Sequence, residues 1–579
     1  MDSNIMIPLM ELPIEILQDN LFPFLPARDL LSLTCTSKFF LTLCTDDAVW
    51  KRKLLADFNY SGAGTARISG WKVIYRGLHK PKVYVWGETA NARMGVVDLP
   101  KSSVYGQPFP LQLKFPSTST RIVSIAAGGM SFYALDSEGS LHVWGTLDGN
   151  TPALSSDGYS EAGRPAYTPH KLLMPSPIRS ISCGRLHASV LDSRNKVWTF
   201  VNWGRPFSIN SPTLLDAASP PVQVECGWGF SSVLTASGNI YVWWPFSDPL
   251  ARIIQENQQS MDSDPDKKAK PTEANEIPCA TYSIDSLALT KLPPLPDLPA
   301  LRKTGVDPED NQEPPRIVQI AGLDKHLVGV TDQGHVLKFG VLADESQSLN
   351  GSWEYLHHFS DISHIRGHKV FNDGNKSLAA PDTMKITHVT GNFQHFVAYS
   401  TGSSSLVLIG EDSATAVTEP DIKPELQNRS VISVAIGDWH NAALTADGKV
   451  LTWGAFSSGA LGLGDPAKLP PGAPGGYPND GQRRRRPPQV DTPSPVRFDW
   501  GTKEPRDRFA FAITAAGWHT GALVMDLNPD GDEDDEYEME EPDQPLDPHE
   551  YPLNPDGQGP PILPPFRIGI HRRGRGRGV

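Results

Sequence analysis

The chain has 579 residues and a formal net charge of −14, and its 39% hydrophobic content favours a folded protein with a large core over a disordered chain. The acidic balance argues against non-specific binding of the whole chain to nucleic acid or to an anionic membrane. Five scattered cysteines without Cys-x-x-Cys spacing indicate neither a disulfide framework nor a zinc site.

The first residues, "MDSNIMIPLMELP", lack the positively charged start of a signal peptide. No uninterrupted apolar run approaches the length that spans a bilayer, so no membrane partner is expected. We therefore expect a protein of the cytoplasm, the nucleus or both.

Residues 12–58 show helical spacing of apolar side chains. Pro13 suits the start of a first helix, Asp29 is a good N-cap for a second, and Asp46 or Asp47 would cap a third. A helical module of under 50 residues with this much exposed apolar surface should be marginal alone. We expect a partner to complete it.

The order Leu-Pro, Glu-Ile-Leu, Phe-Leu-Pro, Asp-Leu-Leu-x-Leu and a distal Trp is similar to the F-box, although the stretch ending at Phe40 departs from the Val-Cys-x-x-Trp usual in that family. The resemblance implies that residues 9–58 dock on the Skp adaptor of cullin-based ubiquitin ligases. The alternative is a generic helical cap on the next domain. Residues 59–80 would form a linker with a short helix. The resemblance implies adaptor binding by Leu12, Pro13, Ile16, Leu17, Leu25, Pro26, Leu30 and Leu33.

A repeated unit occupies the middle of the chain. The chain is also rich in glycine and proline, which favour turns. The stretch "AIGDWHNAALTADGKVLTWG" (residues 435–454) has an opening glycine, two β-rich runs joined by a polar-glycine turn, and a closing Trp-Gly. In four copies the closing aromatic residue lies 16 positions after the opening glycine, as from Gly437 to Trp453. The copies open at Gly128, Gly184, Gly227, Gly322, Gly391 and Gly437.

Two half-copies complement each other. "PKVYVWG", ending at Gly87, has only the closing half, and the stretch around Gly517 has only the opening half. A ring needs its last unit completed by its first strand, which removes exposed sheet edges. The sequence therefore predicts a mainly β fold, a closed seven-bladed β-propeller over residues 81–526, in which residues 83–86 seal the blade that holds Gly517.

The copies resemble regulator-of-chromosome-condensation repeats, which carry a histidine after the opening Ala-Gly. Only His187 and His440 keep this histidine, and we interpret them as packing and hydrogen-bonding residues rather than ligands or catalysts. The repeated tryptophans are interpreted as blade core. At the histidine position, the other copies are assigned Ser131, Phe230, Lys325, Gln394 and Thr520.

Two inserts, at about 254–315 and 466–508, are rich in proline, glycine and charge and predict extruded, partly disordered loops. The second contains "RRRR" at 483–486, which resembles a nuclear localisation signal, and "DTPSP" at 491–495, a candidate phosphorylation site. Residues 527–579 predict a disordered tail, because residues 530–543 carry ten acidic residues and no basic one. An Arg-Gly tract follows.

No phosphate loop, metal helix or nucleophile elbow is present, so neither a cofactor nor catalysis by this chain is expected. The pairing of an F-box-like module with these repeats resembles the fungal SCF-associated-factor proteins. It implies the substrate-recognition subunit of an SCF-type E3 ubiquitin ligase, with the Skp adaptor, a cullin and an unidentified protein substrate as partners. The alternatives are a guanine-nucleotide exchange factor or chromatin-binding propeller, and a scaffold outside any ligase. The net negative charge argues against nucleic acid as a partner.

Overall fold

The computed structural model describes residues 9–102, 104–149, 153, 158–285, 287–305, 313–372, 378–401, 405–478, 489–500 and 507–527. The predicted acidic and Arg-Gly tail falls outside the described residues from 528 onward, and so do residues 483–486 with their basic run. None of the helices within these ranges is long and apolar enough to cross a membrane.

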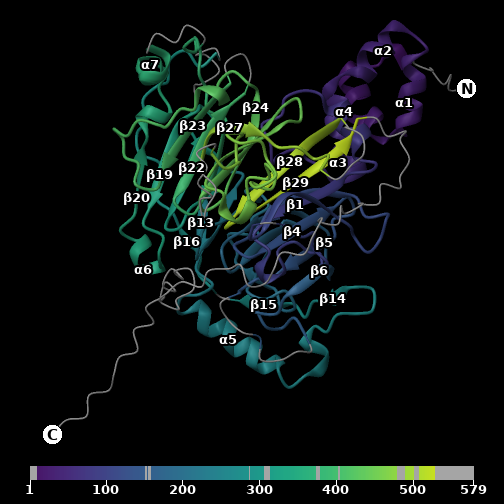
Figure 1. The fold of residues 1–579 in the computed structure, drawn as a ribbon, viewed down its shortest axis with the longest axis vertical. Coiled ribbons are helices and arrows are strands. Elements are labelled where there is room, and N and C mark those ends of the chain that lie inside the picture. The colour runs from purple at the N-terminus through teal and green to yellow at the C-terminus, as the bar shows by residue number, and fades with distance from the viewer. Residues whose placement is uncertain are drawn as a thin grey trace, which may run out of the picture. The chain divides into compact units, whose positions relative to one another are not determined.

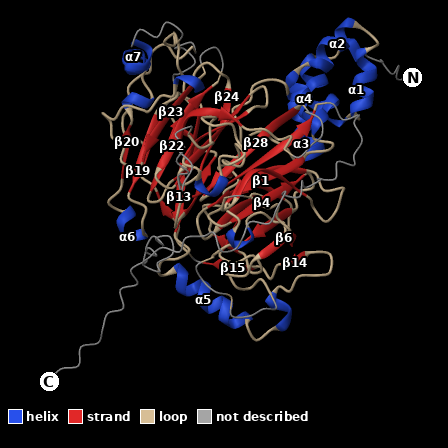
Figure 2. Ribbon diagram, in the orientation of Figure 1, coloured by secondary structure: helices blue, strands red, loops and turns tan. Residues whose placement is uncertain are grey.

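Seven antiparallel sheets form the blades of a propeller, and helices at the N-terminus precede them (Figures 1 and 2). This confirms the predicted fold. The first three blades contain β3 (Ile122–Ala127), β4 (Ser131–Asp136), β5 (Leu141–Gly145) and β6 (Ala166–Leu173); β7 (Ile178–Cys183), β8 (Ala188–Asp192), β9 (Val197–Phe200) and β10 (Phe207–Asn210); and β11 (Pro221–Cys226), β12 (Ser231–Thr235) and β13 (Ile240–Trp243). The next three contain β17 (Ile317–Gly322), β18 (His326–Thr331), β19 (Val336–Gly340) and β20 (Ser352–Tyr355); β21 (His388–Asn392), β22 (His395–Ser400) and β23 (Leu406–Glu411); and β24 (Val431–Ile436), β25 (His440–Thr445), β26 (Val450–Gly454) and β27 (Val490–Pro495).

The seventh blade joins the two ends of the repeat region. It contains β28 (Arg508–Ala516) and β29 (His519–Asp526), followed by β1 (Lys82–Gly87) and β2 (Gln107–Leu113). Val83 pairs with Leu523 and Val85 with Gly521, so the first strand seals the last blade as the half-copies predicted.

The opening glycines are required where the first turns of neighbouring blades converge. A Cβ atom on Gly184 would lie 2.5 Å from the carbonyl oxygen of Gly227, and one on Gly322 would lie 2.4 Å from that of Cys226. The closing glycine meets a different need, since Gly454 has a φ of +111°, which L side chains rarely adopt. Trp144 is fully buried and donates from Nε1 to the Arg93 carbonyl at 3.1 Å, in keeping with a blade-core role.

The structure corrects the prediction of a disordered loop over residues 254–305. This insert begins with α5 (Leu250–Met261) and then adds β14 (Glu276–Pro278) to the first blade and β15 (Tyr282–Asp285) to the second, both in parallel. It ends as β16 (Thr290–Lys291), the fourth strand of the third blade. Buried Arg205 holds the insert, donating to the Lys267 carbonyl at 2.8 Å and the Gln258 carbonyl at 3.1 Å.

The second insert is described at 466–478 and 489–500. Its "DTPSP" lies in β27, the outer strand of the sixth blade, rather than in a loop. Thr492 is exposed, whereas Ser494 is 4% exposed, so only the first is accessible for modification as the strand stands.

The N-terminal module has its own apolar core. Its second helix starts earlier than expected, because Pro26 rather than Asp29 is the N-cap of α1. Asp46 caps α3 as predicted and accepts from the Ala48 amide at 2.7 Å. The elements are η1 (Leu9–Glu11), η2 (Ile16–Leu21), η3 (Phe22–Phe24), α1 (Ala27–Thr34), α2 (Lys38–Thr45), α3 (Asp47–Phe58) and the linker helix α4 (Trp71–Gly77). Shorter helices in the ring are η4 (Ala90–Ala92), η5 (Pro265–Lys268), α6 (Glu345–Ser348), η7 (His357–Phe359), α7 (Ile362–Gly367), α8 (Lys369–Asn372), η8 (Pro424–Leu426) and η9 (Ser457–Gly459).

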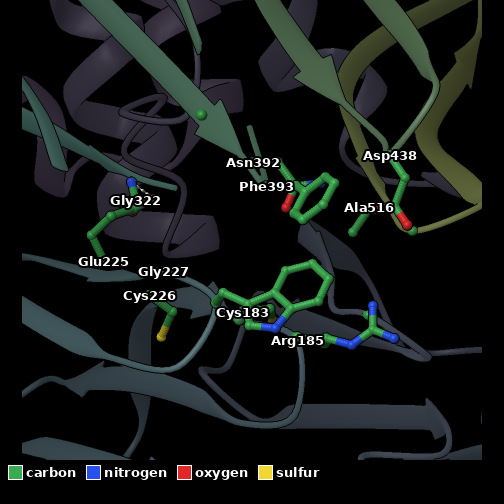
Figure 3. Close-up of a pocket in the computed structure, with 15 residues that line it drawn as sticks. Cys183, Arg185, Glu225, Cys226, Gly227, Gly322, Asn392, Phe393, Asp438 and Ala516 are labelled. Atoms are coloured by element: carbon green, nitrogen blue, oxygen red, sulfur yellow. Dashed lines mark hydrogen bonds between the residues drawn. The ribbon is translucent and has the colours of Figure 1, made fainter. Parts of the chain in front are cut away.

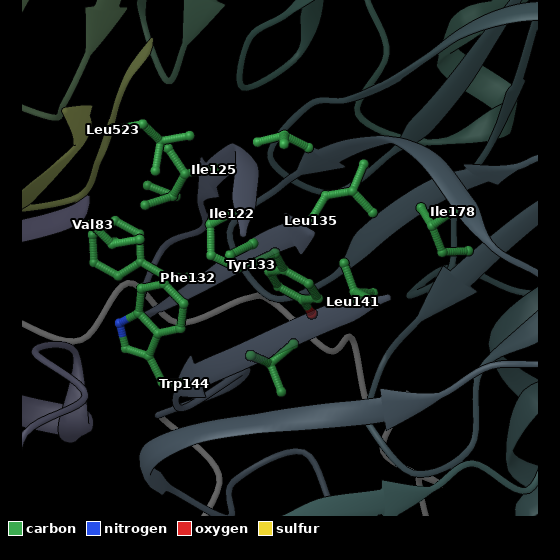
Figure 4. Packing of buried hydrophobic residues seen from close by; sticks show 14 of the residues in the cluster. Val83, Ile122, Ile125, Phe132, Tyr133, Leu135, Leu141, Trp144, Ile178 and Leu523 are labelled. Carbon is green, nitrogen blue, oxygen red and sulfur yellow. The ribbon is translucent and has the colours of Figure 1, made fainter. Parts of the chain in front are cut away.

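One apolar cluster joins the helices to the propeller. Trp50 and Phe58 of α3 and Trp71 of α4 belong to the same buried cluster as Val83 and Phe132 of the blades. Figure 4 shows the blade part of this cluster. The helical module is therefore packed on the ring and not merely tethered to it.

Candidate functional site

The ring has two ends with different loops. The turns between the first and second strands of each blade lie at one end, termed the open end. The turns between second and third strands lie at the other, termed the linker end. The alternation follows from antiparallel pairing within each blade.

The linker covers the centre of the linker end. Asn59 Nδ2 donates to the Ile178 carbonyl of the second blade at 3.0 Å, and the Ala66 amide donates to the Ile432 carbonyl of the sixth at 2.6 Å. Between them, Tyr60 packs edge-on against Phe511 of the seventh blade, with ring centroids 6.1 Å apart. All three blade residues lie in the first strands, so the linker crosses the axis of the ring.

Two carboxylates join α3 to α4. Asp47 accepts from the backbone amides of Gly70 and Trp71 at 2.9 and 3.0 Å, which binds the start of α4. Asp57 accepts from the Tyr75 hydroxyl at 2.6 Å. The predicted helical module is thus fixed to the linker by charge-assisted hydrogen bonds at both ends of the contact.

The structure separates the predicted adaptor-binding residues into three groups. Leu17 and Leu30 are fully buried in the module's own core, so they hold the module together and are not accessible to a partner. Leu12, Leu25 and Leu33 pack partly buried against that core. The exposed members are Pro13, Ile16 and Pro26.

Other apolar side chains of the module are more exposed than the predicted ones. Phe24 is 80% exposed, in a molecule whose other phenylalanines and leucines mostly lie in blade cores. Such a concentration of exposed apolar residues is typical of an interaction site. The neighbours Leu30 and Leu31 differ only in the direction they face, which sequence spacing left open. The exposed apolar set consists of Leu9, Met10, Ile14, Ile16, Phe24, Leu31, Leu41 and Leu55.

A pocket lies at the open end, where the first turns of the blades meet (Figure 3). The Trp228 side chain packs between Phe393, with ring centroids 4.8 Å apart, and the Arg185 guanidinium, 4.2 Å from the indole centroid. Asp438 lines the pocket from the sixth blade. Burial raises the pKa of its carboxyl, and the positive charges of Arg185 and Arg93 partly offset this.

A second acid lines the same pocket. Burial raises the pKa of Glu225 to about 7, although the Gly322 amide donates to its carboxylate at 3.3 Å. Two tryptophans on the same set of turns face solvent, since Trp439 is 56% and Trp518 38% exposed. The open end therefore combines aromatic side chains with charges of both signs.

The repeat histidines are structural, as predicted. His187 Nε2 lies 3.0 Å from the Ser231 hydroxyl and His440 Nε2 lies 2.8 Å from that of Thr520, and both side chains are buried. Burial lowers the pKa of each to about 4.

Two further histidines hold the repeat's histidine position, although counting a fixed number of residues from the opening glycine did not find them. His326 pairs with Gly340 and His519 with Gly87, in the same register in which His440 pairs with Gly454. The assignments of Lys325 and Thr520 to this position were therefore wrong by one residue. The assignment of Gln394 was wrong by two, since Phe396 is the residue that pairs with the closing Gly410.

Within the described ranges, no group of three or more histidine, cysteine, aspartate or glutamate side chains could hold a metal ion.

Two family models match stretches of this chain. Residues 9–56 match the F-box-like family, and residues 431–460 match the regulator of chromosome condensation (RCC1) repeat. The chain is 37% identical over 118 residues to SCF-associated factor 1 of Saccharomyces cerevisiae, covering 20% of this chain and 16% of that protein. It is 26% identical over 152 residues to F-box protein pof9 of Schizosaccharomyces pombe, covering 26% of this chain and 30% of that protein.

These alignments span less than a third of either curated relative. The solved structure of Prp20p from Saccharomyces cerevisiae aligns with a TM-score of 0.45 at 15% identity, over 80% of this chain and 96% of that one.

Proposed function

We propose that this chain, which carries an F-box-like region ahead of RCC1-type propeller repeats, is the substrate-recognition subunit of an SCF-type E3 ubiquitin ligase. The observation that carries the proposal is the exposed apolar set on helices packed against the ring. These helices bind the Skp adaptor and, through it, a cullin. The propeller binds the protein substrate.

In this function the chain contributes position rather than chemistry. Holding a substrate lysine near an activated ubiquitin converts a bimolecular encounter into an effectively unimolecular one. The covalent step belongs to other subunits, and no cofactor is needed here. The complex acts in the cytoplasm, the nucleus or both.

Adaptor binding by the full chain tests the proposal. Ile16→Asp and Phe24→Asp each place a charge on the exposed apolar set without entering the module's core. The matched control is Leu215→Asp, since Leu215 is 69% exposed on the connection after β10. Leu12 is a poorer site for mutation because it packs against the core.

We expect the wild type and the control to bind purified Skp adaptor, and each module variant to bind at least about tenfold more weakly, as for loss of a hot-spot contact. Absence of binding by the wild type, or equal binding by all the variants, would contradict the proposal. The exchange-factor or chromatin-binding alternative and the scaffold alternative both predict no adaptor binding.

A further inference from the structure

The two ends of the ring are not equally accessible to a partner. At the linker end the segment from Asn59 to Ala66 crosses the axis and packs on first strands, with Tyr60 and Ala66 buried. At the open end the pocket between the first turns faces outward. A partner that reaches the centre of the ring must therefore come from the open end.

Rigid backbone holds the two exposed tryptophans at this end. The Trp439 carbonyl accepts from the Ala455 amide at 2.8 Å, and the Trp518 carbonyl accepts from the Glu88 amide at 2.8 Å. The Asp438 amide donates to the Gly517 carbonyl at 2.8 Å and joins the two turns. These bonds hold the backbone of both turns in place, so the positions from which the two indoles project are set before a partner packs on them.

Arg185 and Asp438 place opposite charges on opposite sides of the pocket, since they belong to the second and sixth of seven blades. Stacking on Trp228 holds the Arg185 guanidinium in place. In the part of the chain that the structure describes, neither charged group makes an ion pair or a side-chain hydrogen bond. A guanidinium donates to a carbonyl oxygen and a carboxylate accepts from an N–H, so the pair matches the two polar groups of a peptide bond.

We propose that the open end binds an extended segment of the substrate protein, with a backbone amide of that segment between Arg185 and Asp438 and its apolar side chains on Trp439 and Trp518. This inference rests on the proposed function, of which it names the substrate site. A nucleic acid is the poorer fit, because the carboxylates of Asp438 and Glu225 share the pocket with the arginine and phosphate binding needs a positive excess.

A display library of random short peptides, selected against the full chain, tests this inference without knowledge of the substrate. The affinity of each enriched peptide is then measured for the wild type, Trp439→Ala, Trp518→Ala and Asp438→Asn. Leu215→Ala, an exposed apolar residue away from the open end, is the matched control. We expect about tenfold or greater loss for the three open-end variants and no change for the control.

Hydrogen exchange supplies a second readout. Bound peptide should slow exchange at residues 183–187, 225–230, 391–395, 436–441 and 516–520. Enriched peptides that bind all variants equally, or that protect other residues, would overturn the inference. Thermal unfolding of each variant at the wild-type temperature would show that lost binding is not lost folding.

Adaptor binding measured on the same proteins separates this inference from the proposed function. The open-end variants should bind the adaptor as the wild type does. A chain that binds the adaptor but enriches no peptide overturns the inference alone. A chain that enriches peptides through Trp439 and Trp518 but does not bind the adaptor overturns the proposed function, and the ring then remains a peptide-binding domain.

Discussion

Asp47→Ala should loosen the contact between α3 and the linker helix α4. The carboxylate accepts from two backbone amides, of Gly70 and Trp71, at 2.9 and 3.0 Å. Hydrogen bonds to a charged group contribute about 1.5–3 kcal/mol each, and an N-cap substitution costs about 0.5–2 kcal/mol. Since Asp47 is only half-buried, solvent screens part of this, and we expect a loss of about 2 kcal/mol.

A protein with several structural parts has no single free energy of unfolding, so the assay must be local. Native-state hydrogen exchange reports the opening of α4 alone. A loss of about 2 kcal/mol corresponds to about 30-fold faster exchange at residues 70–78. Asp46→Ala, which removes the cap of α3 and a hydrogen bond from Gln18 Nε2 but touches no residue of α4, is the matched control and should leave these amides unchanged. Unchanged exchange in Asp47→Ala would refute the view that this carboxylate couples the module to the ring.

Arg205→Met should free the insert from the second blade and cost it about 2–4 kcal/mol of local stability, since two part-buried carbonyls and the Asp262 carboxylate lose their donor; hydrogen exchange at residues 250–285 would show it, and unchanged rates would contradict it. His187 and His440 have pKa values of about 4 in the fold against 6.5 for the free side chain, so the unfolded chain binds their protons first. Their contribution is complete above pH 6.5 and is lost as pH falls towards 4, by about 3 kcal/mol each; replacing both with glutamine should make the acid side of a thermal-unfolding profile less steep. His388 and His519, whose pKa values burial also lowers, would remain, and so would Glu225, which acts in the opposite sense. Ser494→Glu should lower the unfolding temperature because it buries a charge, whereas Thr492→Glu should leave it nearly unchanged; equal effects would show that β27 does not pack as described.

The blades could be predicted because each is specified by residues close together in the sequence. The turn and the closing Trp-Gly lie within one hairpin, and the two half-copies needed only to be matched. The insert could not be predicted in the same way. β14 and β15 each have few residues and pair with strands of earlier blades, so neither gives a periodic signal of its own, and composition alone suggested disorder.

The candidate sites show the same limit. Helical spacing found the apolar residues of the N-terminal module but did not show that Leu30 faces the core while Leu31 faces solvent. The pocket could not be predicted, because Arg185 and Asp438 are far apart in the sequence and line the same pocket only in the folded ring. The counting error at His519 has the same origin, since strand pairing rather than position along the chain defines the register.

The crowding of the first turns at the open end also explains where a binding surface could arise. The opening glycine cannot change at Gly184, Gly227 and Gly322, because a Cβ there would lie 2.4 to 2.5 Å from a carbonyl oxygen of the neighbouring turn. The next residue is constrained in some copies, since a Cβ on Gly129 would lie 2.6 Å from the Arg185 carbonyl oxygen and Leu323 is fully buried. Four of the open-end residues directly follow an opening glycine: Arg185, Trp228, Asp438 and Trp518. Exchanging these four side chains between their copies should therefore redirect binding while the blades stay intact.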